Sequence, residues 1–240
     1  MVSAYDELWR GGPRFLSDAG AVRVTTDSVL LGAFAARIRA KTILDLGCGS
    51  GVLAVLLGLS HPGAAVDAVD IQPEAAARAA AAMELNGLSP AGVRCGDLRD
   101  HRALFAAGRF DLVVCNPPYF PVGSGASAPD PARAAARDER CCTLEDVCAA
   151  AGYLTRWGGA FALVHRPERL SELCCALTRH GLEPKRLRFV HPRPGSAPNL
   201  LLLEARRGGK PGLKLLPPLA LCAPDGTDSE EICRIYHRRT

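Results

Sequence analysis

The stretch that decides the fold is Thr42-Ile43-Leu44-Asp45-Leu46-Gly47-Cys48-Gly49-Ser50-Gly51, which is followed by an apolar run over 52–59. The first five residues predict a buried strand, because they form a short apolar run that stops at glycine. Glycines at alternate positions predict a tight loop, and the apolar run predicts a helix directly after it. Strand, glycine loop and helix in this order are typical of a nucleotide-binding α/β unit.

The spacing of the glycines limits the kind of ligand. Gly47, Gly49 and Gly51 give GxGxG, whereas the loop that seats a pyrophosphate on a helix start has GxGxxG. This loop lets a ligand approach its backbone but lacks the third glycine at the spacing that a pyrophosphate requires. It therefore fits an aminoacyl–nucleoside. Asp70 ends the next apolar run, roughly 20 residues after the loop, where an acid can accept the hydroxyls of a ribose. Asp97 ends the run after that and is placed to meet an adenine amine.

Strand patterns alternate with helix patterns through most of the chain. The predicted strands are 42–46, 65–70, 92–97, 110–115, 160–164, 185–191 and 199–205, and the predicted helices are 28–38, 52–59, 73–85, 144–154 and 168–180. This alternation predicts a parallel sheet that binds ligands at the carboxyl ends of its strands. We expect one domain over 1–240: an N-terminal hairpin or lid (1–27), a core (28–206) and a C-terminal tail with a terminal helix (207–240).

A second motif ends the run Phe110-Asp111-Leu112-Val113-Val114-Cys115. Asn116-Pro117-Pro118-Tyr119 follows it, and two consecutive prolines cannot donate to a sheet ladder, so the strand must end at Asn116. The result is a rigid spur with a carboxamide, proline-flanked carbonyls and an aromatic ring. Such a set suits a planar group that carries an amine on its edge, such as a nucleobase. The alternative is an ordinary strand exit that ends in two prolines.

Composition excludes several classes of protein. The chain has 240 residues, 48% of them hydrophobic, and a net charge of +4, which suits one α/β domain with a substantial core. None of the ten cysteines forms a CxxC pair, and the six histidines show no ligand-like spacing to them, so we expect no metal site. No apolar run is long enough to span a membrane and no signal peptide is recognisable. Free thiols then indicate a cytoplasmic protein.

The positive charge is concentrated near the C-terminus. Between Lys185 and Lys214 there are eight Lys or Arg residues and one acid, Glu204. Such an end on a nearly neutral body suggests a polyanionic partner, whose phosphates these side chains would hold. A solvated basic face is the alternative, and charge alone does not separate the two.

With these motifs in place, the sequence resembles a known family. The segment 45–51 looks like the S-adenosylmethionine loop of class I methyltransferases, and Asn116-Pro117-Pro118-Tyr119 looks like the catalytic motif of those that methylate an amine or amide nitrogen. The segments Thr26-Asp27-Ser28-Val29-Leu30-Leu31 and Ala136-Arg137-Asp138-Glu139, together with the tail, are similar to the bacterial tRNA(Val) adenine-N6 methyltransferases. The resemblance covers nearly the whole chain, although Asp138 stands where that family pattern has histidine.

The resemblance implies a Rossmann-like α/β fold with a seven-stranded, mostly parallel sheet, an antiparallel last strand and helices on both faces. It also implies S-adenosylmethionine as cofactor, tRNA as substrate and a monomer or weak dimer. The expected catalytic residues are Asn116, Pro117, Pro118 and Tyr119. The expected cofactor-binding residues are Thr26, Asp45, Gly47, Gly49, Gly51, Asp70, Ile71, Asp97, Leu98 and Asn116.

Other functions remain compatible with parts of the pattern. The same motif serves enzymes that methylate rRNA or a protein glutamine, because a carboxamide and an adenine amine present similar edges. The basic C-terminal third favours RNA. A dinucleotide-dependent oxidoreductase is disfavoured by the GxGxG spacing and by the segment 116–119. A non-catalytic RNA-binding module is disfavoured because the loop, the acids and the segment 116–119 are all intact.

Overall fold

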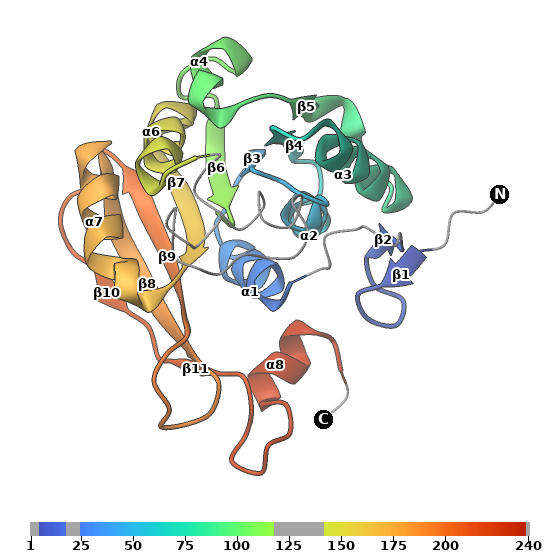
Figure 1. The fold of residues 1–240 in the computed structure, drawn as a ribbon, viewed down its shortest axis with the longest axis vertical. Helices are drawn as coiled ribbons and strands as arrows, with labels where there is room; N and C mark the ends of the chain where they lie inside the picture. Colours follow the sequence, from blue (N-terminus) through green and yellow to red (C-terminus); the bar gives the residue numbers. More distant parts are fainter. Residues whose placement is uncertain (1–4, 18–24, 118–141, 239–240) are drawn as a thin grey trace.

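The computed structural model describes residues 5–17, 25–117 and 142–238. Pro118, Tyr119 and the segment 136–139 therefore lie outside the described residues. Within the described part, a central sheet is flanked by helices on both faces (Figure 1). The strands are β3 (Thr42–Leu46), β4 (Ala65–Asp70), β5 (Val93–Cys95), β6 (Phe110–Cys115), β7 (Thr155–His165), β8 (Leu182–His191), β9 (Leu200–Arg207), β10 (Lys214–Leu215) and β11 (Leu219–Ala220).

The topology is that of a doubly wound sheet. Its spatial order is β10-β8-β9-β7-β6-β3-β4-β5, and β11 also pairs with β8. β5, β4, β3, β6 and β7 run parallel, whereas β9 runs antiparallel to both of its neighbours, β7 and β8. The predicted fold class, with its antiparallel last long strand, is confirmed. The two-residue strands β10 and β11 add to the seven expected strands, and the sequence pattern did not predict them.

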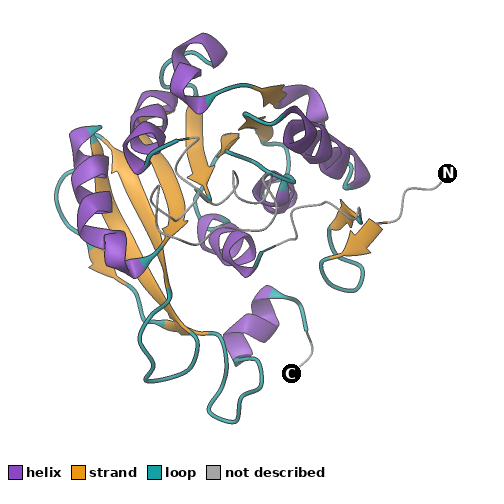
Figure 2. Cartoon of the chain, viewed as in Figure 1, coloured by secondary structure: helices purple, strands orange, loops and turns teal. Residues whose placement is uncertain are grey.

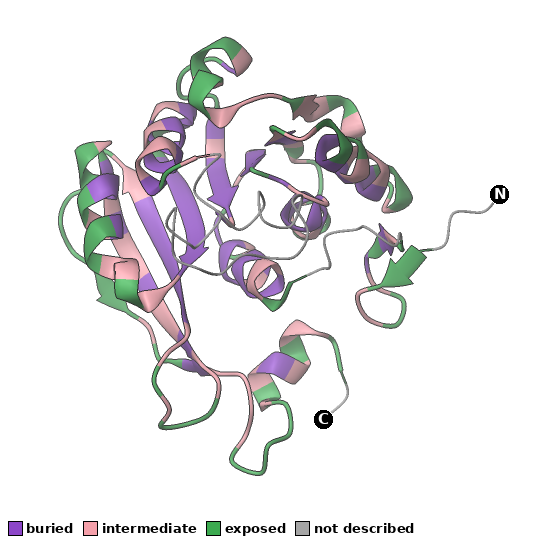
Figure 3. Ribbon diagram, viewed as in Figure 1, coloured by how far each residue is buried: buried purple, intermediate pink, exposed green. Residues whose placement is uncertain are grey.

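The helices cover the two faces of the sheet unequally. Figure 2 shows them around the strands. The α-helices are α1 (Thr26–Ala35), α2 (Val52–Ser60), α3 (Pro73–Leu85), α4 (His101–Leu104), α6 (Leu144–Leu154), α7 (Leu170–Arg179) and α8 (Glu230–Ile235). The 3-10 helices are η1 (Pro90–Gly92), η2 (Leu98–Asp100) and η3 (Pro167–Arg169). α6 and α7 share one apolar core with the sheet, whereas α1, α2 and α8 share the core of the opposite face. Buried residues accordingly gather on the central strands and on the helix surfaces that meet them (Figure 3).

Several boundaries differ from the prediction for local reasons. α1 begins at Thr26 because the Thr25 side chain accepts a hydrogen bond from Ser28 N and caps the helix. β5 is shorter than predicted, since Gly96 N bonds to Asp70 O and Asp97 caps η2. β7 begins at Thr155 rather than at residue 160, because Thr155 pairs with Phe110 across an irregularity in the ladder.

The two chain ends pack on the body of the domain. β1 (Tyr5–Glu7) and β2 (Arg14–Leu16) form an antiparallel hairpin, and Phe15 is buried against α3. Asn86 at the end of α3 accepts from Arg14 N at 2.9 Å and donates to Arg14 O at 2.8 Å. At the other end, Arg188 in β8 forms a double ion pair with Glu231 of α8, both bonds being 2.7 Å.

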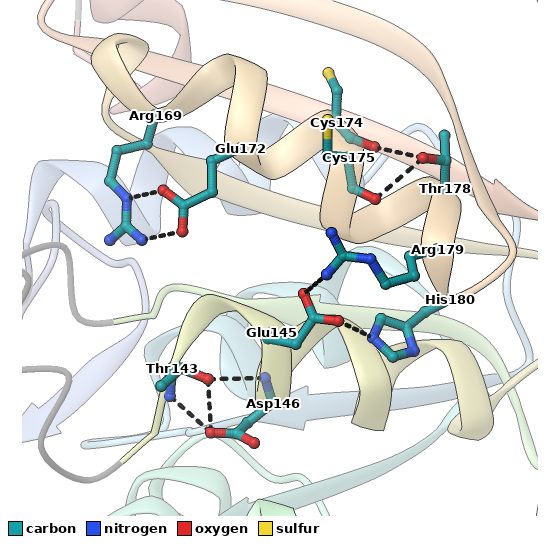
Figure 4. A network of polar contacts seen from close by, with 10 residues as sticks. All are labelled: Thr143, Glu145, Asp146, Arg169, Glu172, Cys174, Cys175, Thr178, Arg179 and His180. Atoms are coloured by element: carbon teal, nitrogen blue, oxygen red, sulfur yellow. Dashed lines mark hydrogen bonds and ion pairs between the residues drawn. The ribbon is translucent and has the colours of Figure 1, made fainter.

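A capping box starts α6. Thr143 N donates to Asp146 Oδ2 at 2.9 Å, and Asp146 N donates to Thr143 Oγ1 at 3.2 Å. Figure 4 shows this pair beside Glu145, which joins α6 to Arg179 and His180 at the end of α7. These contacts fix the start of a helix whose side chains fill the core under β6 and β7.

Loss of this cap gives a measurable change in stability. Thr143→Ala should lower the free energy of unfolding by about 1 kcal/mol, because the N–H group of Asp146 in the first turn loses its acceptor, Thr143 Oγ1. Thr143→Ser keeps an acceptor oxygen and serves as the control. Chemical denaturation measures both variants, and equal midpoints for Thr143→Ala and wild type would show that the capping box does not support α6.

Candidate active site

The loops after β3, β4 and β5 lie against one another at the carboxyl edge of the sheet. Gly47 N and Cys48 N both donate to Val69 O, at 2.9 and 3.0 Å. Gly96 N, which follows β5, donates to Asp70 O at 2.9 Å. The structure therefore brings together the predicted glycine loop and the ends of the two strands that carry the predicted acids.

The three glycines of the loop have two different roles. Gly47 and Gly49 have φ values of +77° and +53°, and a Cβ added to either would meet no atom within 4 Å. Gly51, with φ +79°, lies so close to α3 that a Cβ would come within 2.8 Å of Ala79 Cα. Gly47 and Gly49 leave open space along the backbone, whereas Gly51 allows the start of α2 to pack on α3.

Asp70 fastens the glycine loop to the end of β4. Its Oδ2 accepts from Gly49 N at 2.8 Å, and its Oδ1 accepts from Gln72 N at 3.0 Å. Each carboxylate oxygen has a second lone pair, so this half-buried side chain keeps acceptor capacity for a ligand. Ile71 follows and is 42% exposed, which leaves an apolar surface beside that carboxylate.

Asp45, near the end of β3, is the most deeply buried acid of this edge. It is 1% exposed, its Oδ2 accepts from Ala54 N at 3.0 Å, and its Oδ1 has no partner among the described residues. Burial, with a smaller contribution from the nearby charge of Asp70, raises the pKa of Asp45 to about 7. A buried carboxylate with an unused oxygen beside open backbone suits a ligand that carries positive charge.

Asp97 and Leu98 lie at the start of η2, after β5. Asp97 Oδ1 accepts from Arg99 N at 2.9 Å, and the carboxylate also pairs with the Arg99 guanidinium. These hydrogen bonds, first of all those of the Arg99 side chain, lower the pKa of Asp97 and keep it ionised. Asp97 thus caps η2 and already has a cationic partner, and the Arg99 side chain is half-exposed.

Asn116 and Pro117 leave β6 next to the glycine loop. β6 pairs with β3 so that Val114 lies opposite Asp45, and Asn116 and Gly47 each follow two residues later, where the two adjacent strands have ended. Asn116 Nδ2 donates to Ser28 Oγ in α1 at 2.8 Å. Thr26 lies two residues before Ser28, at the exposed start of α1, where the Tyr236 hydroxyl contacts its side chain.

The basic C-terminal third does not form one surface at this edge. Arg186 and Arg206 both pair with Glu204, and Arg188 pairs with Glu231. The end of β9 and the start of β8 lie at the opposite edge of the sheet and carry the side chains Lys185, Arg206 and Arg207. Much of the charge that the sequence concentrates in this segment is therefore used within the protein or lies far from the glycine loop.

Ser28 is the residue of this edge that sequence reasoning missed. It is the first residue of the predicted helix 28–38, and in the structure it lies in the first turn of α1, which Thr25 caps. Its bond to Asn116 joins residues 88 positions apart, and no local pattern predicts such a contact.

No group of three or more potential metal ligands occurs among the described residues, and no helix in that part of the chain has the length and apolarity to cross a membrane.

The features of this edge fit S-adenosylmethionine. The open glycines accommodate a ligand close to the backbone, Asp70 offers acceptors for vicinal hydroxyls, and the unused oxygen of Asp45 matches a cationic group. The cysteines nearby do not add reactive groups, because burial raises the pKa of the Cys48 and Cys115 thiols well above the ordinary value and keeps them neutral.

Comparison with known proteins agrees with this reading. Residues 21–128 match the model of the family described as the methyltransferase small domain. A structure of a predicted O-methyltransferase from Agrobacterium tumefaciens superposes with a TM-score of 0.71 at 22% identity, covering 88% of this chain and 96% of that one. An rRNA N2 methyltransferase from T. thermophilus, solved with AdoMet and guanosine, gives a TM-score of 0.57 at 24% identity, covering 85% of this chain and 50% of that one. The fold is that of the class I methyltransferases.

Curated relatives are similar over most of their length. A tRNA1(Val) (adenine(37)-N6)-methyltransferase from Porphyromonas gingivalis is 37% identical over 193 residues, which are 78% of this chain and 75% of the relative. A protein of the same name from Yersinia pseudotuberculosis is 32% identical over 222 residues, which are 91% of this chain and 85% of the relative. The chain therefore belongs to the tRNA1(Val) (adenine(37)-N6)-methyltransferase family.

Proposed function

We propose that this protein transfers a methyl group from S-adenosylmethionine to the exocyclic N6 amine of adenine-37 in tRNA1(Val). The observation that supports the proposal is the register of β3 and β6, because the glycine loop and Asn116 directly follow the paired ends of these two adjacent strands. A donor loop and an amide able to hold an amine thus leave the sheet side by side. The names of the curated relatives supply the nucleoside, its position and the tRNA.

The part of the site proposed to bind the methyl donor consists of residues that end or follow β3, β4 and β5, together with Thr26 of α1. The backbone at Gly47 and Gly49 would lie against the ligand, and Asp70 would accept the two ribose hydroxyls. Ile71 and Leu98 would border the adenine ring, while Thr26 would meet the methionine end. Gly51 acts indirectly, since it allows α2 and α3 to approach.

Asp97 serves as the acceptor for the adenine amine of the donor in this proposal. Because Arg99 already donates to the Asp97 carboxylate, the ligand amine would share that carboxylate or replace the guanidinium. The exposed position of Arg99 allows this exchange, since its side chain can turn into solvent. The pairing also keeps Asp97 ionised before the ligand arrives.

The part of the site proposed to bind the adenine that accepts the methyl group, its acceptor half, positions the amine of that base and provides hydrogen-bond acceptors for it. S-adenosylmethionine supplies an electrophilic methyl group on its sulfonium. An adenine amine is a weak nucleophile because its lone pair is delocalised into the ring, so the protein must favour a pyramidal nitrogen. Asn116 Oδ1 and Pro117 O would accept the two N–H hydrogens and aim the lone pair at the methyl carbon. Stacking of the base on Tyr119 remains a prediction for a residue outside the described part of the chain.

The buried Asp45 makes donor binding and stability depend on pH. Its pKa of about 7 lies above the unfolded value of 3.8, so between these values the folded chain binds more protons than the unfolded chain. Stability without ligand therefore falls as the pH rises from about 4 to about 7. A cationic ligand beside Asp45 favours ionisation, so donor binding near pH 6.5 should release a proton.

Titration calorimetry in buffers of different ionisation enthalpy measures this release. Wild type should release a substantial fraction of one proton per donor bound at pH 6.5, and much less at pH 8.5. Asp45→Asn has no titrating group at position 45, so donor binding to this variant should release no proton at either pH. Equal proton release from wild type and Asp45→Asn would contradict the assignment of the titrating group.

The class of acceptor is tested with labelled S-adenosylmethionine. Incubation with total tRNA, with rRNA and with a protein extract should label tRNA alone. Label in protein would point to a glutamine side chain, and label in rRNA would point to a different RNA. Either outcome would overturn the proposed substrate while leaving the methyltransferase fold in place.

A further inference from the structure

The first turn of α1 contacts the amide that is proposed to hold the acceptor amine. Asn116 Nδ2 donates to Ser28 Oγ at 2.8 Å, and both side chains are half-buried. A carboxamide has two orientations that differ little in shape but exchange a donor for an acceptor. In the orientation seen here the amide nitrogen meets α1, and Oδ1 lies on the side of the group away from Ser28.

Ser28 is itself held by the residue that caps α1. Ser28 N donates to Thr25 Oγ1 at 3.4 Å, and the two side-chain oxygens are 3.2 Å apart. A hydroxyl has one proton and two lone pairs. When Ser28 donates its proton to Thr25 Oγ1, only lone pairs face Asn116, and the NH2 end of the amide is the end that complements them.

We propose that Ser28, supported by Thr25, is a positioning residue that sets the orientation of the Asn116 carboxamide. The inference rests on the proposed role of Asn116 in methyl transfer. The reversed amide would present an NH2 group to the acceptor amine, so donor would face donor. Loss of the Ser28 contact removes one of the interactions that hold the terminal bond of Asn116, which is a soft torsion. The helix cap of α1 thus takes part in preparing the acceptor half of the site.

The variant Ser28→Ala tests the contact with little risk to folding. Loss of one hydrogen bond of ordinary net strength that orients the amide should lower kcat roughly 3- to 10-fold. The affinity for S-adenosylmethionine, measured by calorimetry, should stay unchanged, because Ser28 touches the acceptor side. Ser28→Thr keeps the hydroxyl and should restore kcat. Ser89→Ala removes a serine hydroxyl from the start of another short helix, η1, and should leave kcat unchanged.

A double-mutant cycle separates orientation of the amide from simple loss of the helix cap. Thr25→Val removes the hydroxyl that shares a hydrogen bond with Ser28 Oγ, so it should lower both kcat and the melting temperature. If Thr25 acts on catalysis through Ser28, the double variant Thr25→Val/Ser28→Ala should have the kcat of Ser28→Ala alone. Independent losses of kcat that multiply would overturn the relay.

A measurement without turnover completes the test. The side-chain NH2 signal of Asn116, identified in the 15N spectrum by its loss in Asn116→Ala, should exchange slowly with solvent in wild type and faster in Ser28→Ala. Wild-type kcat in Ser28→Ala, or a loss confined to donor affinity or melting temperature, would overturn the proposal. Wild type that methylates no tRNA would instead overturn the proposed function, while the amide exchange would still report on the contact.

Discussion

Replacing Asn116 with alanine is expected to abolish methyl transfer while leaving the affinity for S-adenosylmethionine within about twofold of wild type. The amide acts on the acceptor amine as its nitrogen becomes pyramidal, so its contribution is larger in the transition state than in the ground state. Loss of one such group lowers kcat on the order of 10²- to 10³-fold. Single-turnover rates with labelled donor and tRNA measure the loss, and calorimetry measures the donor affinity.

Two further results make this test specific. Asn116→Asp keeps an acceptor oxygen and should retain more activity than Asn116→Ala. The melting temperature should change little in either variant, because Asn116 is half-buried and lies at a strand end rather than within the ladder. Turnover close to wild type in Asn116→Ala would contradict the proposed mechanism, whatever happens to the donor affinity.

Replacing Asp70 with alanine should have the opposite effect and weaken donor binding first. The change removes the acceptor proposed for the ribose, and it also releases Gly49 N and Gln72 N, which the carboxylate holds at 2.8 and 3.0 Å. Hydrogen bonds to a charged group are worth about 1.5–3 kcal/mol, so the dissociation constant should rise roughly 10- to 150-fold. Calorimetric titration with S-adenosylmethionine measures it directly.

A matched variant controls for the loss of charge. Asp225→Ala removes an exposed carboxylate from the tail, where its partner is Thr227, and should leave donor affinity unchanged. At saturating donor, Asp70→Ala should recover a large part of the wild-type turnover, since the acceptor half is intact. If donor affinity in Asp70→Ala equals that of wild type, the ribose assignment is wrong.

The sequence predicted those parts of the fold that depend on local patterns. Short apolar runs marked the strands at 42–46, 65–70 and 110–115 to the residue, because each stops at a glycine, an acid or a proline. The predicted helix 144–154 agrees with α6 for a local reason as well, because Thr143 caps its first turn. The two-residue strands β10 and β11 were not predictable, since pairing with β8, rather than their own composition, makes them strands.

The site was predictable in its elements and less so in its contacts. Alternation of strands and helices placed the glycine loop, Asp70 and Asn116 at one edge, as the structure has them. The bond between Ser28 and Asn116 and the pairing of Arg186 with Glu204 depend on the tertiary fold. For that reason the positive charge concentrated between residues 185 and 214 overstated the basic surface available near the site, and no sequence pattern indicated that the first turn of α1 contacts Asn116.

The most direct test of the proposed function is the position of the transferred methyl group. Purified protein, S-adenosylmethionine and unmodified tRNA1(Val) are incubated, and the RNA is digested and mapped by mass spectrometry. The expected product is N6-methyladenosine at position 37. No product is expected when that adenine is replaced by guanine, or when Asn116→Ala is used in place of wild type. A methyl group on another nucleoside, or product that survives the loss of adenine-37, would contradict it.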